Sequence, residues 1–146
     1  MGFSTNGAAA ILFVAAFMVV GVVVPAAQAG FEDVSESMSA QENRALDAGN
    51  TDIALDSVTY NNTSDQLTVH VSNTGTTSLH VTDTDLLVDG AFTNPETAVE
   101  GASARTVWAP GETLTFTLST ADEPKRVVVV TEHAVSAGTN NVTVVS

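Results

Sequence analysis

The chain divides into a continuous apolar stretch and a longer region in which apolar and polar residues alternate. Residues 7–27 are almost all Ala, Val, Ile, Leu, Phe and Met, and the first charged side chain is Glu32. A helix of about 20 apolar residues matches the hydrocarbon thickness of a bilayer, where loops and open sheets cannot satisfy their backbone groups. The pattern predicts an N-terminal membrane helix followed by a β-rich body.

The N-terminal segment fits two interpretations. A retained transmembrane helix over residues 8–24 would end at Pro25, because proline lacks an amide donor and clashes with the preceding turn. A secretory signal peptide would be cleaved after Ala29, within the small-x-small sequence Ala27-Gln28-Ala29. We favour retention, because residues 1–6 contain no Lys or Arg and the apolar run is longer than a usual signal core.

The segment after the apolar stretch is predicted to be a helical stalk. One narrow stripe at 3-4 spacing, which is typical of a helix face, contains Phe31, Val34, Met38, Gln41 and Ala45. Gly49-Asn50 is a helix-stop signal. Two arrangements are open for this stripe: a juxtamembrane stalk, or a helix packed loosely on its own domain.

Beyond residue 50 the period of the pattern changes to two. Leu67, Val69 and Val71 alternate with polar residues, which predicts a half-buried strand. Short strands are likewise predicted at residues 53–60, 67–72, 79–81, 86–88, 106–108, 113–118 and 142–145, and a buried run of Val at 126–131. Residues 91–105 carry few strand signals and are expected to form a long loop.

Short strands without helices between them predict a mainly β fold, an antiparallel immunoglobulin-like β-sandwich. The expected domains are a transmembrane anchor at residues 1–30, a helical stalk at 31–50 and an extracytoplasmic sandwich at 51–146.

Charge narrows the range of functions. The chain has 17 acidic and 4 basic residues and a net charge of −13, which argues against binding nucleic acid or anionic headgroups. A folded acidic surface of this kind fits a halophilic protein or an ordinary acidic exported protein, and we favour the halophilic one, since mobile ions screen its self-repulsion. There is no cysteine, so the body has no disulfides and depends on its core.

Candidate metal and catalytic chemistry is sparse. His70 and His80 would face each other if residues 70–80 formed a tight hairpin, but we expect solvated surface histidines. Asp83, Asp85 and Asp89 resemble the start of a calcium loop without completing an EF-hand, and we expect a solvated acidic loop. His133 follows Glu132 without a nucleophile arrangement, and we expect neither a cofactor nor an enzyme.

Three glycosylation sequons begin at Asn61, Asn62 and Asn141. The first two share one predicted turn at residues 61–65, where an oligosaccharide would project without clashing. These asparagines are the candidate modification sites.

The N-terminal sequence Met1-Gly2-Phe3-Ser4-Thr5-Asn6-Gly7-Ala8, which runs into the uncharged helix, resembles the FlaF (ArlF) family of haloarchaea. The stalk from Phe31 and residues 50–60 continue the resemblance. It extends to residues 69–75, Val-His-Val-Ser-Asn-Thr-Gly, and to the motif Trp108-x-Pro110-Gly111-Glu112.

The resemblance implies an accessory protein of the archaellum, the rotating swimming filament of archaea. It implies a membrane-anchored sandwich outside the cell that binds the S-layer glycoprotein as a stator element, as a homodimer and alongside FlaG. A stator of this kind supplies the fixed support against which a rotary motor turns.

Two other classes stay open. A pilin or archaellin also joins an apolar helix to a β domain, but its precursor usually carries Lys or Arg before the cleavage site, and none precedes Gly7 here. A secreted soluble binding domain would follow from cleavage after Ala29.

Overall fold

The computed structural model describes residues 2–146, apart from the side chains at positions 2–7, 17 and 19–27. It has two compact units, Met1–Asn43 and Arg44–Ser146. Helix α1 (Gly2–Asn50) ends at the predicted stop signal. The expected end at Pro25 is wrong, because the backbone stays helical through that position. Proline removes one backbone hydrogen bond, which is a local defect in a helix of 49 residues.

Part of the expected membrane span falls on side chains outside the described residues, at positions 17 and 19–24 of residues 8–24. Within the described part of the chain, no helix combines the length and the apolarity needed to cross a membrane. On the stalk, Phe31, Val34 and Met38 are exposed.

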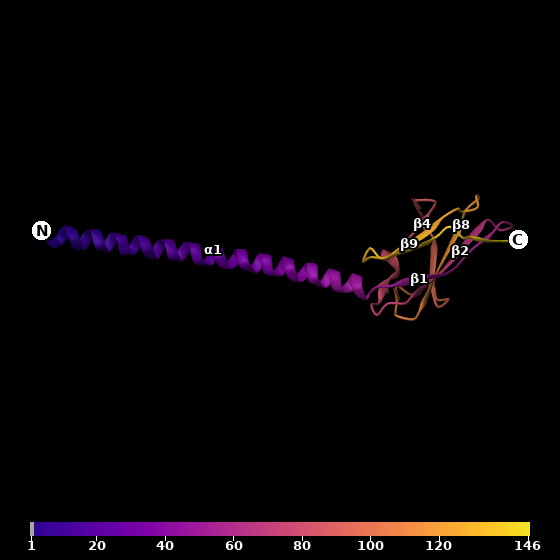
Figure 1. Ribbon diagram of the computed structural model, residues 1–146, viewed down its shortest axis with the longest axis horizontal. Helices are drawn as coiled ribbons and strands as arrows, with labels where there is room; N and C mark the ends of the chain where they lie inside the picture. Colours follow the sequence, from indigo (N-terminus) through magenta and orange to yellow (C-terminus); the bar gives the residue numbers. More distant parts are fainter. Residues whose placement is uncertain (1) are drawn as a thin grey trace. The chain divides into compact units, whose positions relative to one another are not determined.

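The body is mainly β, as predicted (Figure 1). Its strands form two large sheets and one small one. The five-stranded sheet has the order β11-β1-β2-β8-β6, the four-stranded sheet has the order β10-β9-β4-β5, and β3 pairs with β7. The strands are β1 (Ile53–Asn61), β2 (Gln66–Asn73), β3 (Leu79–His80), β4 (Asp85–Val88), β5 (Ala91–Phe92), β6 (Glu96–Val99), β7 (Val107–Trp108), β8 (Thr113–Ser119), β9 (Val127–Val130), β10 (Ser136–Thr139) and β11 (Thr143–Val145). A 3-10 helix, η1 (Val81–Asp83), follows β3.

One hydrophobic core joins the two large sheets. Leu67, Val69 and Val71 point inward from β2, and Leu86 of β4 and Val129 of β9 come from the other sheet. All five side chains are buried in the same cluster, as alternation with period two requires when one face of each sheet is covered. Trp108 is also fully buried there.

Several details of the predicted topology are wrong. The expected loop at 91–105 contains β5 and β6, and residues 79–81 are a two-residue strand that turns directly into η1. Strand β10 escaped prediction because its sequence, Ser-Ala-Gly-Thr, has one β-branched residue. The sheets are not wholly antiparallel, because β11 pairs in parallel with β1.

Candidate functional site

The last turn of α1 belongs to the same compact unit as the strands, and several of its carbonyl groups are hydrogen-bonded there. The Thr51 hydroxyl donates to the carbonyl oxygen of Asp47 at 2.7 Å, and the Thr76 amide donates to that of Asn50 at 2.8 Å. Helix ends leave such carbonyls without partners inside the helix. The loop between β2 and β3 therefore terminates the helix.

Gly75 makes this close approach possible. Its amide donates to the carbonyl oxygen of Asp52 at 3.0 Å. A Cβ atom at position 75 would clash with the Asn50 carbonyl oxygen and the Asp52 amide nitrogen. The position therefore needs glycine for space beside the helix end.

Asn73 connects this loop to the turn that precedes β8. Its backbone amide donates to the Glu112 carbonyl at 3.0 Å, and its own carbonyl accepts from the Gly111 amide at 2.8 Å. Its side-chain amide donates to the carbonyls of Thr77 at 2.8 Å and Trp108 at 3.3 Å.

The side-chain oxygen of Asn73 accepts from the Gly75 amide at 3.1 Å. Asn73 is only 1% exposed, and both its backbone and its side-chain groups are hydrogen-bonded. The two body motifs that carry the sequence resemblance, residues 69–75 and 108–112, thus meet at this residue. We call Asn50, Asp52, Asn73, Gly75 and Trp108, with the turn 109–112, the helix–sheet joint.

Glu112 fixes the turn of the joint. It accepts hydrogen bonds from Nη1 and Nη2 of Arg105 at 2.6 and 2.8 Å, and from the Ala109 amide at 2.7 Å. The Arg105 guanidinium, with the Ala109 amide, lowers the pKa of Glu112 below its ordinary value. Gly111 has φ +83°, a left-handed conformation that glycine adopts without strain.

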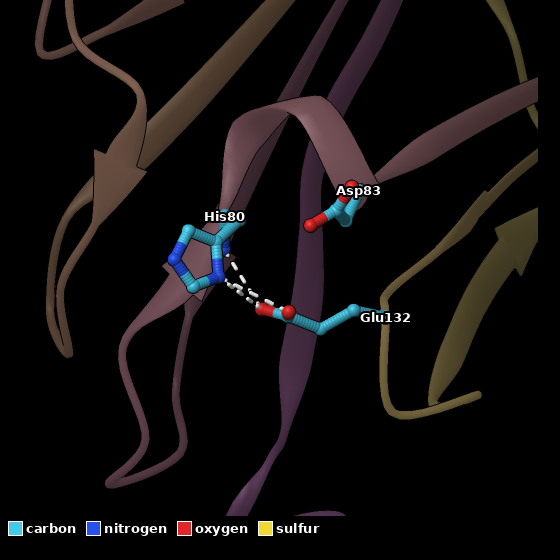
Figure 2. Close-up of side chains that lie close together, drawn as sticks. All are labelled: His80, Asp83 and Glu132. Carbon is cyan, nitrogen blue, oxygen red and sulfur yellow. Dashed lines mark hydrogen bonds and ion pairs between the residues drawn. The ribbon is translucent and has the colours of Figure 1, made fainter.

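The structure separates the two histidines considered as a pair. His70 lies on β2, where its Nδ1 is 3.0 Å from the Thr115 hydroxyl of β8. His80 lies on β3 in another sheet, so the hairpin alternative is wrong. His80 Nδ1 instead lies 3.1 Å from both carboxylate oxygens of Glu132, a residue 52 positions away (Figure 2).

The three aspartates of the supposed calcium loop do not converge either. Asp89 is a turn residue whose carboxylate accepts from the amides of Lys125 at 2.9 Å and Arg126 at 2.8 Å. Asp85 begins β4. Asp83 groups with His80, three residues before it, and with Glu132, which could not be found from sequence spacing.

The sequon asparagines lie at both ends of β11. Asn62 donates its amide to the Val145 carbonyl at 3.0 Å, and Asn141 precedes the strand. The Asn61 side-chain oxygen accepts from the amides of Thr63 and Ser64 at 2.9 and 3.1 Å. Asn62 and Asn141 are exposed and Asn61 is half-buried, and all three remain predicted glycosylation sites.

Comparisons with known proteins assign no family. No protein-family model matches the chain, and no curated protein matches it. Among solved structures, the chain is similar to the archaellum periplasmic stator protein FlaG from Sulfolobus acidocaldarius, with TM-score 0.43, 14% identity and coverage of 61% of this chain and 97% of that chain. It is also similar to the ligand-binding region of serine-glutamate repeat protein A from Enterococcus faecium, with TM-score 0.40, 14% identity and coverage of 65% and 98%. Likenesses at these scores do not identify a shared family.

We predict that Gly75→Ala destabilises the body by about 1–3 kcal/mol, because the added methyl group overpacks the joint. Gly49→Ala is the matched control, since a Cβ there meets nothing within 4 Å and alanine favours the helix. Denaturant unfolding of both variants measures the difference. Equal stabilities would contradict the close approach.

We also predict that Glu112→Gln lowers stability at neutral pH and that this difference shrinks in acid. The folded pKa is below the unfolded one, so the carboxylate's contribution is complete above the ordinary glutamate pKa and is lost as pH falls through the folded pKa. Unfolding free energy measured against pH tests this. Glu96→Gln, an exposed position on β6, is the control and should follow the wild type. A pH-independent difference would refute the assignment.

Proposed function

We propose that this chain is a non-enzymatic accessory component of the archaellum that holds the motor against the S-layer. In this proposal the uncharged N-terminal segment is the membrane anchor, and the body is an immunoglobulin-like sandwich between the membrane and the S-layer. Support comes from the FlaF-like sequence segments and from their meeting at Asn73, which gives the two body motifs one structural purpose.

The observation that carries the proposal is the hydrogen-bonded helix–sheet joint. A stator element must transmit force from its anchor to its wall contact, and a slack linker between them would absorb displacement. Here the carbonyl of Asn50 accepts a hydrogen bond from the Thr76 amide. Asn73 is the last residue of β2, and its backbone is hydrogen-bonded to the turn before β8. Chain and hydrogen bonds together therefore connect the helix end to the centre of the larger sheet.

The sheet edges are the proposed contacts for the S-layer glycoprotein. Strands β11 and β6 end one large sheet and β10 and β5 end the other, so each has one side without a strand partner in the described sheets. Such edges accept an added strand through main-chain hydrogen bonds. These bonds do not depend on side-chain charge, so the acidic side chains of the body do not prevent them. The exposed stripe of Phe31, Val34 and Met38 supports pairing of α1 with a second copy or with a FlaG-like protein.

We predict that deleting the gene abolishes swimming while the filament subunits are still made, because a motor without its fixed support turns its own housing. Swimming is scored on soft agar and filament protein by immunoblot. Wild-type complementation should restore swimming, whereas a copy lacking residues 1–30 should not. Normal swimming of the deletion strain would contradict the proposed function, and loss of filament protein would favour a pilin-like subunit.

We predict further that the full chain co-sediments with isolated S-layer in molar salt. Binding should persist at salt concentrations that screen surface charge, because strand addition does not depend on Coulomb attraction. An unrelated acidic protein of similar net charge serves as the control. If the S-layer sediments without this chain, the S-layer is not its binding partner and the prediction is wrong.

A further inference from the structure

Three ligand-bearing side chains converge at one corner of the body, outside the helix–sheet joint. His80 ends β3, Asp83 ends η1, and Glu132 lies in the turn between β9 and β10. One ligand atom from each lies within 4.8 Å of the other two. In Figure 2 a carboxylate oxygen of Asp83 points toward the side on which Glu132 meets the His80 ring.

The ligand atoms of His80 and Glu132 lie slightly closer together than two ligand atoms on one zinc ion. Zinc binds imidazole nitrogen and carboxylate oxygen at about 2.0–2.2 Å in tetrahedral geometry, which places two ligand atoms roughly 3.3–3.6 Å apart. The distance from His80 Nδ1 to either Glu132 oxygen is 3.1 Å. An ion between them needs only a small opening of this pair and a side-chain rotation of Asp83.

The backbone around these side chains is held in place. The His80 amide donates to Glu132 Oε1 at 2.9 Å, and the Thr84 hydroxyl donates to the His80 carbonyl at 2.8 Å. On the other side, the Thr131 amide donates to the Val135 carbonyl at 2.9 Å and closes the turn that carries Glu132. The ligands therefore project from two fixed segments, which limits the ordering required on binding.

Asp83 differs from Asp89 and Glu112, whose carboxylates have partners. The carboxylate of Asp89 accepts two backbone amides, and that of Glu112 is paired with Arg105. Among the described residues, no hydrogen bond is recorded for the Asp83 carboxylate. The Asp83 carboxylate is therefore available to an ion without loss of an existing bond. The His80 imidazole distinguishes these three residues from a purely acidic patch.

We propose that His80, Asp83 and Glu132 bind one divalent transition-metal ion of the zinc class. An imidazole nitrogen with two carboxylate oxygens suits zinc better than magnesium or calcium, which prefer all-oxygen sites. Three protein ligands leave a fourth position for water. The ion would cross-link the β3–η1 segment to the β9–β10 turn. Hydrogen bonds at His80 and a shared core already connect these two segments.

Calorimetric titration of the untagged full chain with Zn²⁺, in excess Mg²⁺, tests the proposal. We expect saturation at one ion per chain. His80→Ala, Asp83→Asn and Glu132→Gln should each weaken binding by about tenfold or more, since loss of even an outer-shell partner costs 10–100-fold. Fluorescence of the single Trp108 checks that each variant is folded.

Two substitutions are matched controls. Asp85→Asn removes the same charge two residues from Asp83 but lies outside the group, and His70→Gln removes an imidazole on β2. Both should bind Zn²⁺ as the wild type does. Absence of saturable binding, or equal weakening by Asp85→Asn and Asp83→Asn, would overturn the proposal. X-ray absorption of the complex should show one imidazole, and a spectrum with two would equally overturn it.

Discussion

The hydrogen-bond network of Asn73 is the interaction on which the organisation of the body depends. A buried side-chain amide is costly unless its groups are paired, and in the body each of them is paired with backbone. Those partners come from the β2–β3 loop and from Trp108 of β7, and the Asn73 backbone bonds the turn before β8, so this one residue positions all three segments. The same loop accepts the end of α1, so helix termination and sheet construction share one set of bonds.

Sequence patterns predicted the parts of the fold that are determined locally. The alternation at Leu67, Val69 and Val71 identified β2, and Gly49-Asn50 identified the end of α1, because both signals lie within one element. Strands β5 and β6 have only two and four residues, and they exist because β4 and β8 offer them hydrogen-bonding edges. No local pattern encodes the parallel pairing of β11 with β1, which joins the two ends of the body.

The candidate sites divide in the same way. Gly75 and the turn at 109–112 were recognisable as motifs, but their contact through Asn73 depends on the register of distant strands. The histidines were considered as a pair because of their spacing in sequence, whereas the partner of His80 is Glu132, from the other end of the body. A ligand group assembled from two segments about 50 residues apart leaves no local spacing signature for its third member, and only folding brings Glu132 to His80 and Asp83.

The parallel pairing of β11 with β1 has a mechanical consequence. Tension that enters at Ile53 and is resisted across the sheet runs along β1, at right angles to its hydrogen bonds with β2. Under such a load these hydrogen bonds break together in shear and not one after another. With β11 aligned along its other edge, β1 is clamped from both sides over Thr59–Asn61. This second row of hydrogen bonds adds to the resistance of β1 to shear under such a load.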